Sequence, residues 1–402
     1  MNITTLDNGL RVVTYNKDFK KAVIGVYVNT GLINETDDIN GISHVLEHMA
    51  FKGTTTKTAK ELAEQIEGLG GYMNAYTSNE VTAYYVGVLP ENWKIAIDFL
   101  SDILQNSTFP EEEFEKERNV ILEELSRSHD NPTHVLFNHM MYNTYKNSNL
   151  KNPILGPAEN IKKFTANDLK EYMHKWYALD NMIVSACGNI DHDEFVEYVK
   201  ASFNNLPTTC EHNTDNIGFA PGRYEFTDKF DQAHVLLTLN GINAGSMEES
   251  LFGVFTNILN GGMSCRLFQE IREKRGLAYA VSNVDDTGKN WGYFGIYLGV
   301  NKEKIEEAIE ASKNVLKSMI SDISDEELEK AKNITLFNLA NKYDSCSQVS
   351  ISNAYDLIYK NEIPSYEELK GRIQGMTKED IINFSKRYID ENFSITILKP
   401  NE

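Results

Sequence analysis

Two histidines and a glutamate lie close together in the stretch SHVLEHMAFKGT, residues 43–54. On an α-helix, His44 and His48 project from the same face one turn apart, and Glu47 lies near that face. Both imidazoles could then bind one metal ion while the glutamate reaches a metal-bound water. Zinc suits two histidines and a carboxylate, and a catalytic zinc site keeps a fourth position for water. The alternative is a hydrogen-bonded histidine pair in a core helix.

The motif leaves such a site one ligand short, and a third ligand is expected on another helix. The stretch EKERNVILEELSR places Glu117 and Glu124 two turns apart on a stripe with Val120 and Ile121. Burying two carboxylates on an apolar stripe is costly unless a positive charge compensates for them. A zinc ion held by the two histidines would supply that charge.

Two alternatives remain open for this acidic helix. Glu123 competes with Glu124 as a ligand, but it lies about 100° around the helix and is expected to face solvent. The acidic run 111–117 is charged nearly all round, so a solvated helix face explains it well. That explanation is weaker for Glu124.

The chain reads as two similar halves, with strand, helix and turn patterns recurring in one order. The matching stretches are 21–31 and 232–242, 70–88 and 275–300, 91–104 and 302–316, and 109–125 and 323–339. At the last pair, Glu117 corresponds to Ala331 and Glu124 to Asn338, both at an offset of 214 residues. The polar set therefore occurs in one half only, which indicates chemistry, because structural residues would be kept in both.

We predict an α+β fold made of two duplicated α/β domains, each a mostly antiparallel sheet covered by helices. A stretch rich in proline and glycine and without periodicity, LPTTCEHNTDNIGFAPGRYEF, separates the halves. The expected domains are residues 1–207 with the zinc ligands and residues 223–402 without them, joined by a linker at 208–222.

Composition excludes several classes of protein. The formal charge of −20 disfavours nucleic acid and anionic membranes as partners. It would favour basic peptides, although acidity that only confers solubility is the simpler explanation of the charge. The N-terminus resembles no signal peptide and the four cysteines are scattered, so we expect a cytoplasmic protein without a disulfide framework. The stretch LNGGMSCRL lacks the lysine and spacing of a phosphate loop, which disfavours a nucleotide site.

Over essentially its whole length the chain resembles the inverted zincins of peptidase family M16, in the bacterial subfamily similar to mitochondrial processing peptidase. The resemblance is carried by NGISHVLEHMAFKGT, GGYMNAYTSNEVTAYY, FEKERNVILEEL, NPILG, WYALDNMIVSACGNID and GGMSCRLFQEIREKRGLAYAVSN. In this family the third zinc ligand follows the second histidine by about 75 residues, and Glu124 follows His48 by 76. The resemblance implies one Zn²⁺ per chain on His44, His48 and Glu124, with Glu117 as a supporting acid.

The implied reaction is hydrolysis of a peptide bond, with Glu47 as general base. In the family, an arginine and a tyrosine seven residues apart serve substrate binding and the oxyanion. The stretch REKRGLAY places Arg272 and Tyr279 at that spacing, whereas Arg275 lies at the wrong distance from the tyrosine. The alternative for Arg272 is a surface salt bridge with Glu270 or Glu273.

Substrate is expected to bind through its main chain. Two glycines precede YMNAYTS, a strand that would lie at a sheet edge and accept an extended peptide along Asn74, Ala75 and Tyr76. Strand addition recognises the backbone of the peptide more than its side chains, which implies broad specificity for unfolded peptides. Ordinary strand packing explains Tyr72 and Tyr76 equally well.

The resemblance also leads to expectations about how the chain assembles and whether it is active. Single-chain members of the larger family have four α/β units, so a two-unit chain is expected to pair as a C2 homodimer with shared active sites. The alternative function is a non-catalytic scaffold or core subunit of the same family, or hydrolysis of some other amide.

Overall fold

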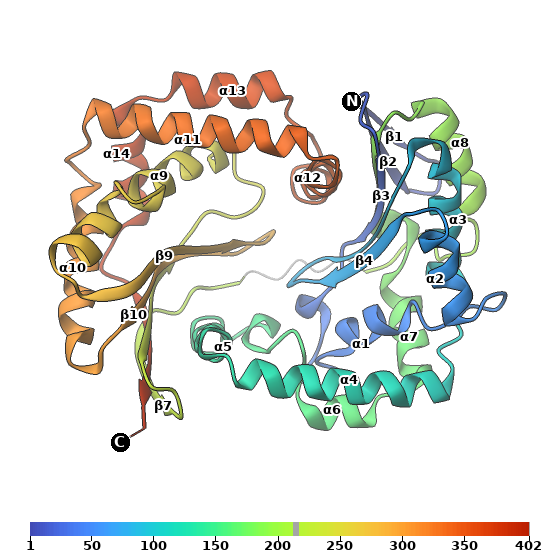
Figure 1. Cartoon of the computed structure of the whole chain (residues 1–402), viewed down its shortest axis with the longest axis horizontal. Helices are drawn as coiled ribbons and strands as arrows, with labels where there is room; N and C mark the ends of the chain where they lie inside the picture. The colour runs from blue at the N-terminus through green and yellow to red at the C-terminus, as the bar shows by residue number, and fades with distance from the viewer. Residues whose placement is uncertain (212–216, 402) are drawn as a thin grey trace. The chain divides into compact units, whose positions relative to one another are not determined.

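The computed structural model describes residues 1–211 and 217–401, which form two compact units (Figure 1). The first unit contains Met1–Arg127, Asn152–Thr214 and Tyr343–Ile363, and the second contains Ser128–Lys151, Asp215–Lys342 and Pro364–Glu402. Residues 212–216, inside the expected linker 208–222, lie outside the described residues. Residues 128–151 of the first half of the chain thus belong to the second unit, and residues 343–363 of the second half belong to the first.

The first unit contains a six-stranded sheet in the order β1-β2-β6-β3-β5-β4. Its strands are β1 (Asn2–Thr5), β2 (Arg11–Asn16), β3 (Ala22–Val28), β4 (Tyr72–Thr77), β5 (Thr82–Val88) and β6 (Met182–Gly188). Only β2 and β6 pair in parallel among the described strands of this sheet. The strand β4 forms one edge of the sheet.

The second unit contains a five-stranded sheet in the order β7-β11-β8-β10-β9. Its strands are β7 (Gly222–Asp228), β8 (Ala233–Asn240), β9 (Ala278–Thr287), β10 (Gly292–Val300) and β11 (Ser394–Pro400). One parallel pair, β7 with β11, again stands beside antiparallel neighbours. The two sheets share one strand order apart from β1, so the predicted duplication and fold class are confirmed.

Helices cover one face of the first sheet and enclose its main core. They are α1 (Ile42–Met49), α2 (Ala59–Glu67), α3 (Trp93–Gln105), α4 (Glu111–His129), α6 (Ala158–Lys163), α7 (Ala166–Trp176) and α8 (His192–Ser202). In β3, Ile24, Val26 and Val28 face this core, whereas Val23 and Tyr27 belong to clusters on the opposite face. The near-continuous apolar run of β3 therefore reflects burial on both faces.

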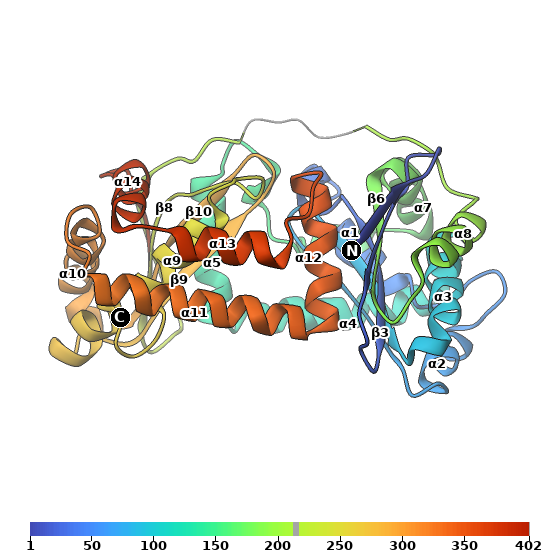
Figure 2. The same cartoon turned by 90° about the horizontal axis from the view of Figure 1, so that it is seen from above.

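The opposite face of each sheet is covered by a helix from the other half of the chain (Figures 1 and 2). The helix α12 (Cys346–Tyr359) packs on β6, β3 and β2, and α5 (Pro132–Thr144) packs on β11, β8 and β7. The same offset of 214 residues relates the start of α5 to the start of α12. The halves thus exchange equivalent helices, which a division of the chain at the linker does not anticipate.

The second unit also has a helical layer on its sheet. It consists of α9 (Glu249–Asn260), a π-helical segment (Phe268–Lys274), α10 (Ile305–Ser318), α11 (Asp325–Asp344), α13 (Tyr366–Gly375) and α14 (Lys378–Tyr388). Across the described residues, no helix has both the length and the apolar character needed to cross a membrane.

Candidate metal centre

The helix α1 carries the two histidines, and a buried carboxylate holds its N-terminus. Gly41, the residue before the helix, has φ = 97° and offers no side-chain cap. Glu35 acts in its place: its Oε2 accepts the N–H of Gly41 at 2.7 Å, and its Oε1 accepts the N–H of Ser43 at 2.9 Å. Burial raises the pKa of Glu35, although these donors act in the opposite direction. A carboxylate at this end also suits the helix dipole.

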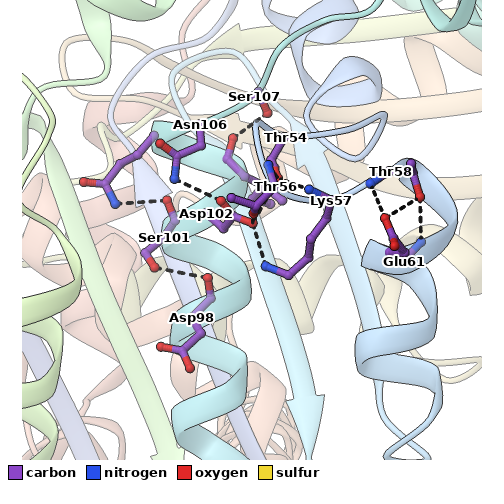
Figure 3. Close-up of polar contacts among 12 residues, drawn as sticks. Thr54, Thr56, Lys57, Thr58, Glu61, Asp98, Ser101, Asp102, Asn106 and Ser107 are labelled. Atoms are coloured by element: carbon purple, nitrogen blue, oxygen red, sulfur yellow. Dashed lines mark hydrogen bonds and ion pairs between the residues drawn. The ribbon is translucent and has the colours of Figure 1, made fainter.

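The loop that follows α1 is fixed by Asp102 of α3 (Figure 3). The Oδ2 atom of Asp102 accepts hydrogen bonds from Thr54 Oγ1 at 3.1 Å and from Lys57 Nζ at 2.8 Å. The next helix, α2, begins with a capping box between Thr58 and Glu61. Both ends of the short helix α1 are therefore anchored, which limits movement of its side chains.

The structure brings His44, His48 and Glu124 together, with one ligand atom from each lying within 4.8 Å of the others. The Oε2 atom of Glu124 lies 3.7 Å from His44 Nε2 and 3.6 Å from His48 Nε2. Two ligands about 2.1 Å from a tetrahedral zinc would stand about 3.4 Å apart. The donor set and its spacing therefore fit a zinc ion with only small adjustments.

The two imidazoles have different surroundings. The side chain of His44 is 9% exposed, and burial, followed by the neighbouring His48, lowers its pKa to about 3. His44 is therefore neutral, as a metal ligand must be. Its Nδ1 atom is buried and has no hydrogen-bond partner within the described part of the chain.

The Nδ1 atom of His48 lies next to the carboxylate of Glu117. This atom lies 3.0 Å from Glu117 Oε2, and the other oxygen of Glu117 pairs with Lys52 Nζ at 2.5 Å. Burial acts to raise the pKa of Glu117, but the hydrogen bonds from Lys52 and His48 outweigh it and lower the pKa. An ionised Glu117 accepts the Nδ1 proton, which leaves Nε2 free for a metal.

The acidic helix α4 differs in one respect from the expected apolar stripe. Ile121 is fully buried as expected, but Val120 is 43% exposed, so the prediction that it shares the buried stripe was wrong. On this side of α4, Ile121 is buried and Glu117 and Glu124 are half-buried, at spacings of four and three residues. Glu123, the competitor, is exposed and lies outside the cluster.

Glu47, the expected base, is held by Thr77 of β4. The hydroxyl of Thr77 donates to Glu47 Oε2 at 2.7 Å. Burial raises the pKa of Glu47, and the hydrogen bonds from Thr77 act against that rise. One carboxylate oxygen of Glu47 is thus fixed by the edge strand.

The expected peptide-binding residues Asn74, Ala75 and Tyr76 lie on β4 at the sheet edge. The backbone N–H of Ala75 donates to Asn74 Oδ1 at 2.9 Å, so a peptide that paired with this N–H would replace the side-chain bond. The hydroxyl of Tyr76 donates to that of Tyr355 on α12 at 3.2 Å. The Tyr76 side chain therefore packs structurally, and only its backbone could serve a peptide.

Arg272 and Tyr279 belong to the second unit, whereas the zinc-type ligands belong to the first. Arg272 lies on the π-helical segment, 5.0 Å from the ring centroid of Phe268. Glu270, one expected salt-bridge partner of Arg272, instead pairs with Arg275 at 2.8 Å and with Lys274 at 3.3 Å. A π-helical turn is uncommon and often marks a functional position.

Tyr279 lies at the start of β9 and is 45% exposed. Burial, followed by contact with Tyr297, raises the pKa of Tyr279 to about 12, so its hydroxyl is protonated and can donate. The hydroxyl of Tyr297 in turn lies 2.8 Å from His234 Nδ1. The Tyr279 ring also lies over Gly299, where a Cβ would come within 2.4 Å of it.

Sequence reasoning missed three residues of this centre: Glu35, Lys52 and Thr77. Each acts through a contact with a residue distant in the sequence or on another element, so helical or strand periodicity gives no signal for it.

Comparison with known families matches two models to the chain. The model described as Insulinase (Peptidase family M16) matches residues 11–158, and the model described as Peptidase M16 inactive domain matches residues 163–335. The first match contains the entire candidate metal centre. The second contains Arg272 and Tyr279.

Relatives and solved structures agree with these models. An uncharacterised zinc protease of Rickettsia felis is 36% identical over 100% of this chain and 98% of its own length. The beta subunit of the mitochondrial-processing peptidase of Mus musculus is 29% identical over 100% of this chain and 84% of its own length. A protease from Helicobacter pylori has the same fold, with a TM-score of 0.89, 23% identity and 99% coverage of both chains.

Proposed function

This chain belongs to peptidase family M16, and from that premise we propose that it is a zinc-dependent endopeptidase or oligopeptidase that hydrolyses unfolded peptides. The observation that carries the proposal is the convergence of His44, His48 and Glu124 within 4.8 Å, on two helices of one unit. The same unit supplies a half-buried, hydrogen-bonded Glu47. A scaffold subunit would have no need of this set.

In the proposed site, His44, His48 and Glu124 hold one zinc ion per chain. Zinc, when bound, would lower the pKa of a water molecule and polarise the scissile carbonyl. Glu117 orients His48 by accepting its Nδ1 proton, as the contact of 3.0 Å supports. The side chain of Glu124 is 44% exposed, which leaves one side of the cluster accessible to substrate.

Glu47 acts as the general base in this proposal. It takes a proton from the attacking water and then delivers that proton to the leaving amine nitrogen as the C–N bond breaks. A raised pKa suits this double duty, because the group must both accept and release a proton near neutral pH. Proton transfer of this kind contributes about 10²–10⁴-fold to a rate.

Substrate binding is proposed on β4 and on the pair Arg272 and Tyr279. An extended peptide would add to the edge strand along Asn74–Tyr76 and take over the N–H of Ala75. Arg272 and Tyr279 would donate to the peptide carbonyls and to the oxyanion. The charge of −20 would favour basic peptides.

We propose further that two chains pair as a C2 homodimer. Each zinc site would then be completed by Arg272 and Tyr279 of the partner subunit. Mixing Glu47→Gln with Arg272→Ala/Tyr279→Phe under subunit exchange tests this. Half of the dimers would be mixed, each with one intact site, so activity should recover to about a quarter of wild type. A mixture that stays inactive, with exchange verified independently, contradicts the shared site.

The function itself is tested with the purified chain and a panel of unstructured peptides a few tens of residues long. Cleavage is expected, with loss of activity after removal of metal by a chelator and recovery on adding zinc. A stably folded protein of similar composition should resist cleavage, because its backbone cannot add to β4. Failure to cleave any peptide with zinc bound would favour the scaffold alternative, and rapid digestion of the folded protein would contradict binding by strand addition.

A further inference from the structure

Thr77 is the last residue of β4, and it contacts the proposed base through both its side chain and its backbone. Its hydroxyl donates to Glu47 Oε2 at 2.7 Å, and its backbone N–H also hydrogen-bonds the Glu47 side chain. Thr77 directly follows Asn74–Tyr76, the segment proposed to pair with the peptide. One residue thus joins the edge strand to the carboxylate on α1.

The two hydrogen bonds from Thr77 matter because they restrict the position of the flexible Glu47 carboxylate. A glutamate side chain has three rotatable bonds, and Glu47 must present an oxygen to a water at one defined position. The Thr77 hydroxyl occupies Oε2, and the other oxygen, Oε1, is then the one expected to take the proton.

We propose that Thr77 is a positioning residue that fixes Oε2 of Glu47 and so aims Oε1 at the attacking water. The proposal rests on the proposed function, since it assigns Thr77 a role only if Glu47 is the base. Because Thr77 belongs to β4, the base and the peptide-binding strand are held at a constant separation. A peptide that pairs with β4 would therefore meet a base already in place.

Thr82 provides a matched control. It lies directly opposite Thr77 in the β4–β5 pair, and its side chain is fully buried. Its hydroxyl donates to the carbonyl of Thr30 at 2.9 Å. Thr82→Val therefore removes a buried strand hydroxyl from the same cross-strand pair without touching the Glu47 carboxylate.

The test compares wild type, Thr77→Val, Thr77→Ser and Thr82→Val, each with its zinc content measured. Loss of a hydrogen bond to a charged group should lower kcat of Thr77→Val on the order of 10- to 100-fold, with KM and zinc content close to wild type. Thr77→Ser keeps the hydroxyl and should recover most of kcat. Thr82→Val should keep kcat within about twofold of wild type, even if it unfolds at a lower temperature.

A readout independent of turnover is the position of the Glu47 carboxylate in crystals of the metal-free chains. In Thr77→Val it should occupy another rotamer or several, whereas in Thr77→Ser and Thr82→Val it should stay in place. Wild-type kcat with an unmoved carboxylate in Thr77→Val overturns the role of Thr77 and leaves the proposed function standing. An equal loss of kcat in Thr82→Val also overturns it, because the effect would then be general to the strand pair. A wild-type chain that cleaves no peptide overturns the proposed function and this role together.

Discussion

Replacing Glu117 with glutamine should weaken zinc binding although Glu117 lies outside the candidate ligand cluster. In the structure its Oε2 lies 3.0 Å from His48 Nδ1 and its Oε1 pairs with Lys52. Glutamine keeps an oxygen that can accept the Nδ1 proton, but it lacks the charge that strengthens this bond and that attracts Lys52. The change therefore converts a charge-assisted hydrogen bond into a neutral one.

The expected size follows from these contacts. A hydrogen bond to a charged group contributes about 1.5–3 kcal/mol and a neutral one about 0.5–1.5 kcal/mol. The difference of about 1–1.5 kcal/mol corresponds to roughly a tenfold loss of zinc affinity. The side chain of Glu117 is only 12% exposed, so solvent screening reduces this little. A tenfold loss is also at the lower end of the loss of metal affinity that follows when a residue hydrogen-bonded to a metal ligand is replaced.

The assay is competition for zinc between the purified chain and a chelator of known affinity. Glu113→Gln is the control, because Glu113 lies one turn earlier on α4 and pairs with Lys116 at 2.8 Å. It should leave the zinc dissociation constant within about twofold of wild type, as expected for a surface pair. An unchanged constant in Glu117→Gln would refute the argument that Glu117 supports His48.

Three further results are expected. Glu124→Gln should lower zinc affinity far more than Glu123→Gln, because only Glu124 is in the ligand cluster; equal effects in metal analysis would contradict the assignment. Glu327→Gln should lower the free energy of unfolding by about 1 kcal/mol at pH 7. The hydrogen bond from Arg266 lowers the pKa of Glu327 to about 2, so the stabilisation by ionised Glu327 is full above the ordinary pKa of 4.5 and is lost as the pH falls towards 2. Urea titrations of wild type and Glu327→Gln at pH 7 and pH 3 measure this loss. A stability difference that does not change with pH would contradict the prediction. Gly41→Ala should destabilise the chain by about 1–3 kcal/mol, because the backbone has φ = 97° and a Cβ would lie 2.9 Å from a facing backbone atom; an unchanged melting temperature would argue against this strain.

Much of the fold could be predicted because the chain carries its pattern twice. The apolar strand 21–31 and its counterpart 232–242 both became central strands, β3 and β8. The exchange of α5 and α12 could not be predicted, because the amphipathic pattern of a helix does not specify which of two similar sheets it covers. The π-helical turn that carries Arg272 was also unforeseen, since its sequence is compatible with an ordinary helix.

Within the candidate site, only residues that share a helix face through their spacing in the sequence could be predicted. His44 and His48 share a face because they are four residues apart, and Glu117 and Glu124 share one because they are seven apart. Val120 was placed on the buried side by the same rule but is exposed, because the period fixes spacing more precisely than it fixes the edge of a buried face. Thr77 and Lys52 act through contacts between separate elements, which spacing along one element cannot reveal.

The most direct test of the central claim compares wild type with Glu47→Gln for two properties of the same preparation, zinc content and cleavage of an unstructured peptide. Glu47 is not a ligand in the proposed site, so the variant should bind the same amount of zinc as wild type. Its rate of peptide cleavage should fall by about 10²–10⁴-fold, because a glutamine side chain cannot take a proton from water. A Glu47→Gln chain that retains zinc and cleaves the peptide at the wild-type rate would contradict the account.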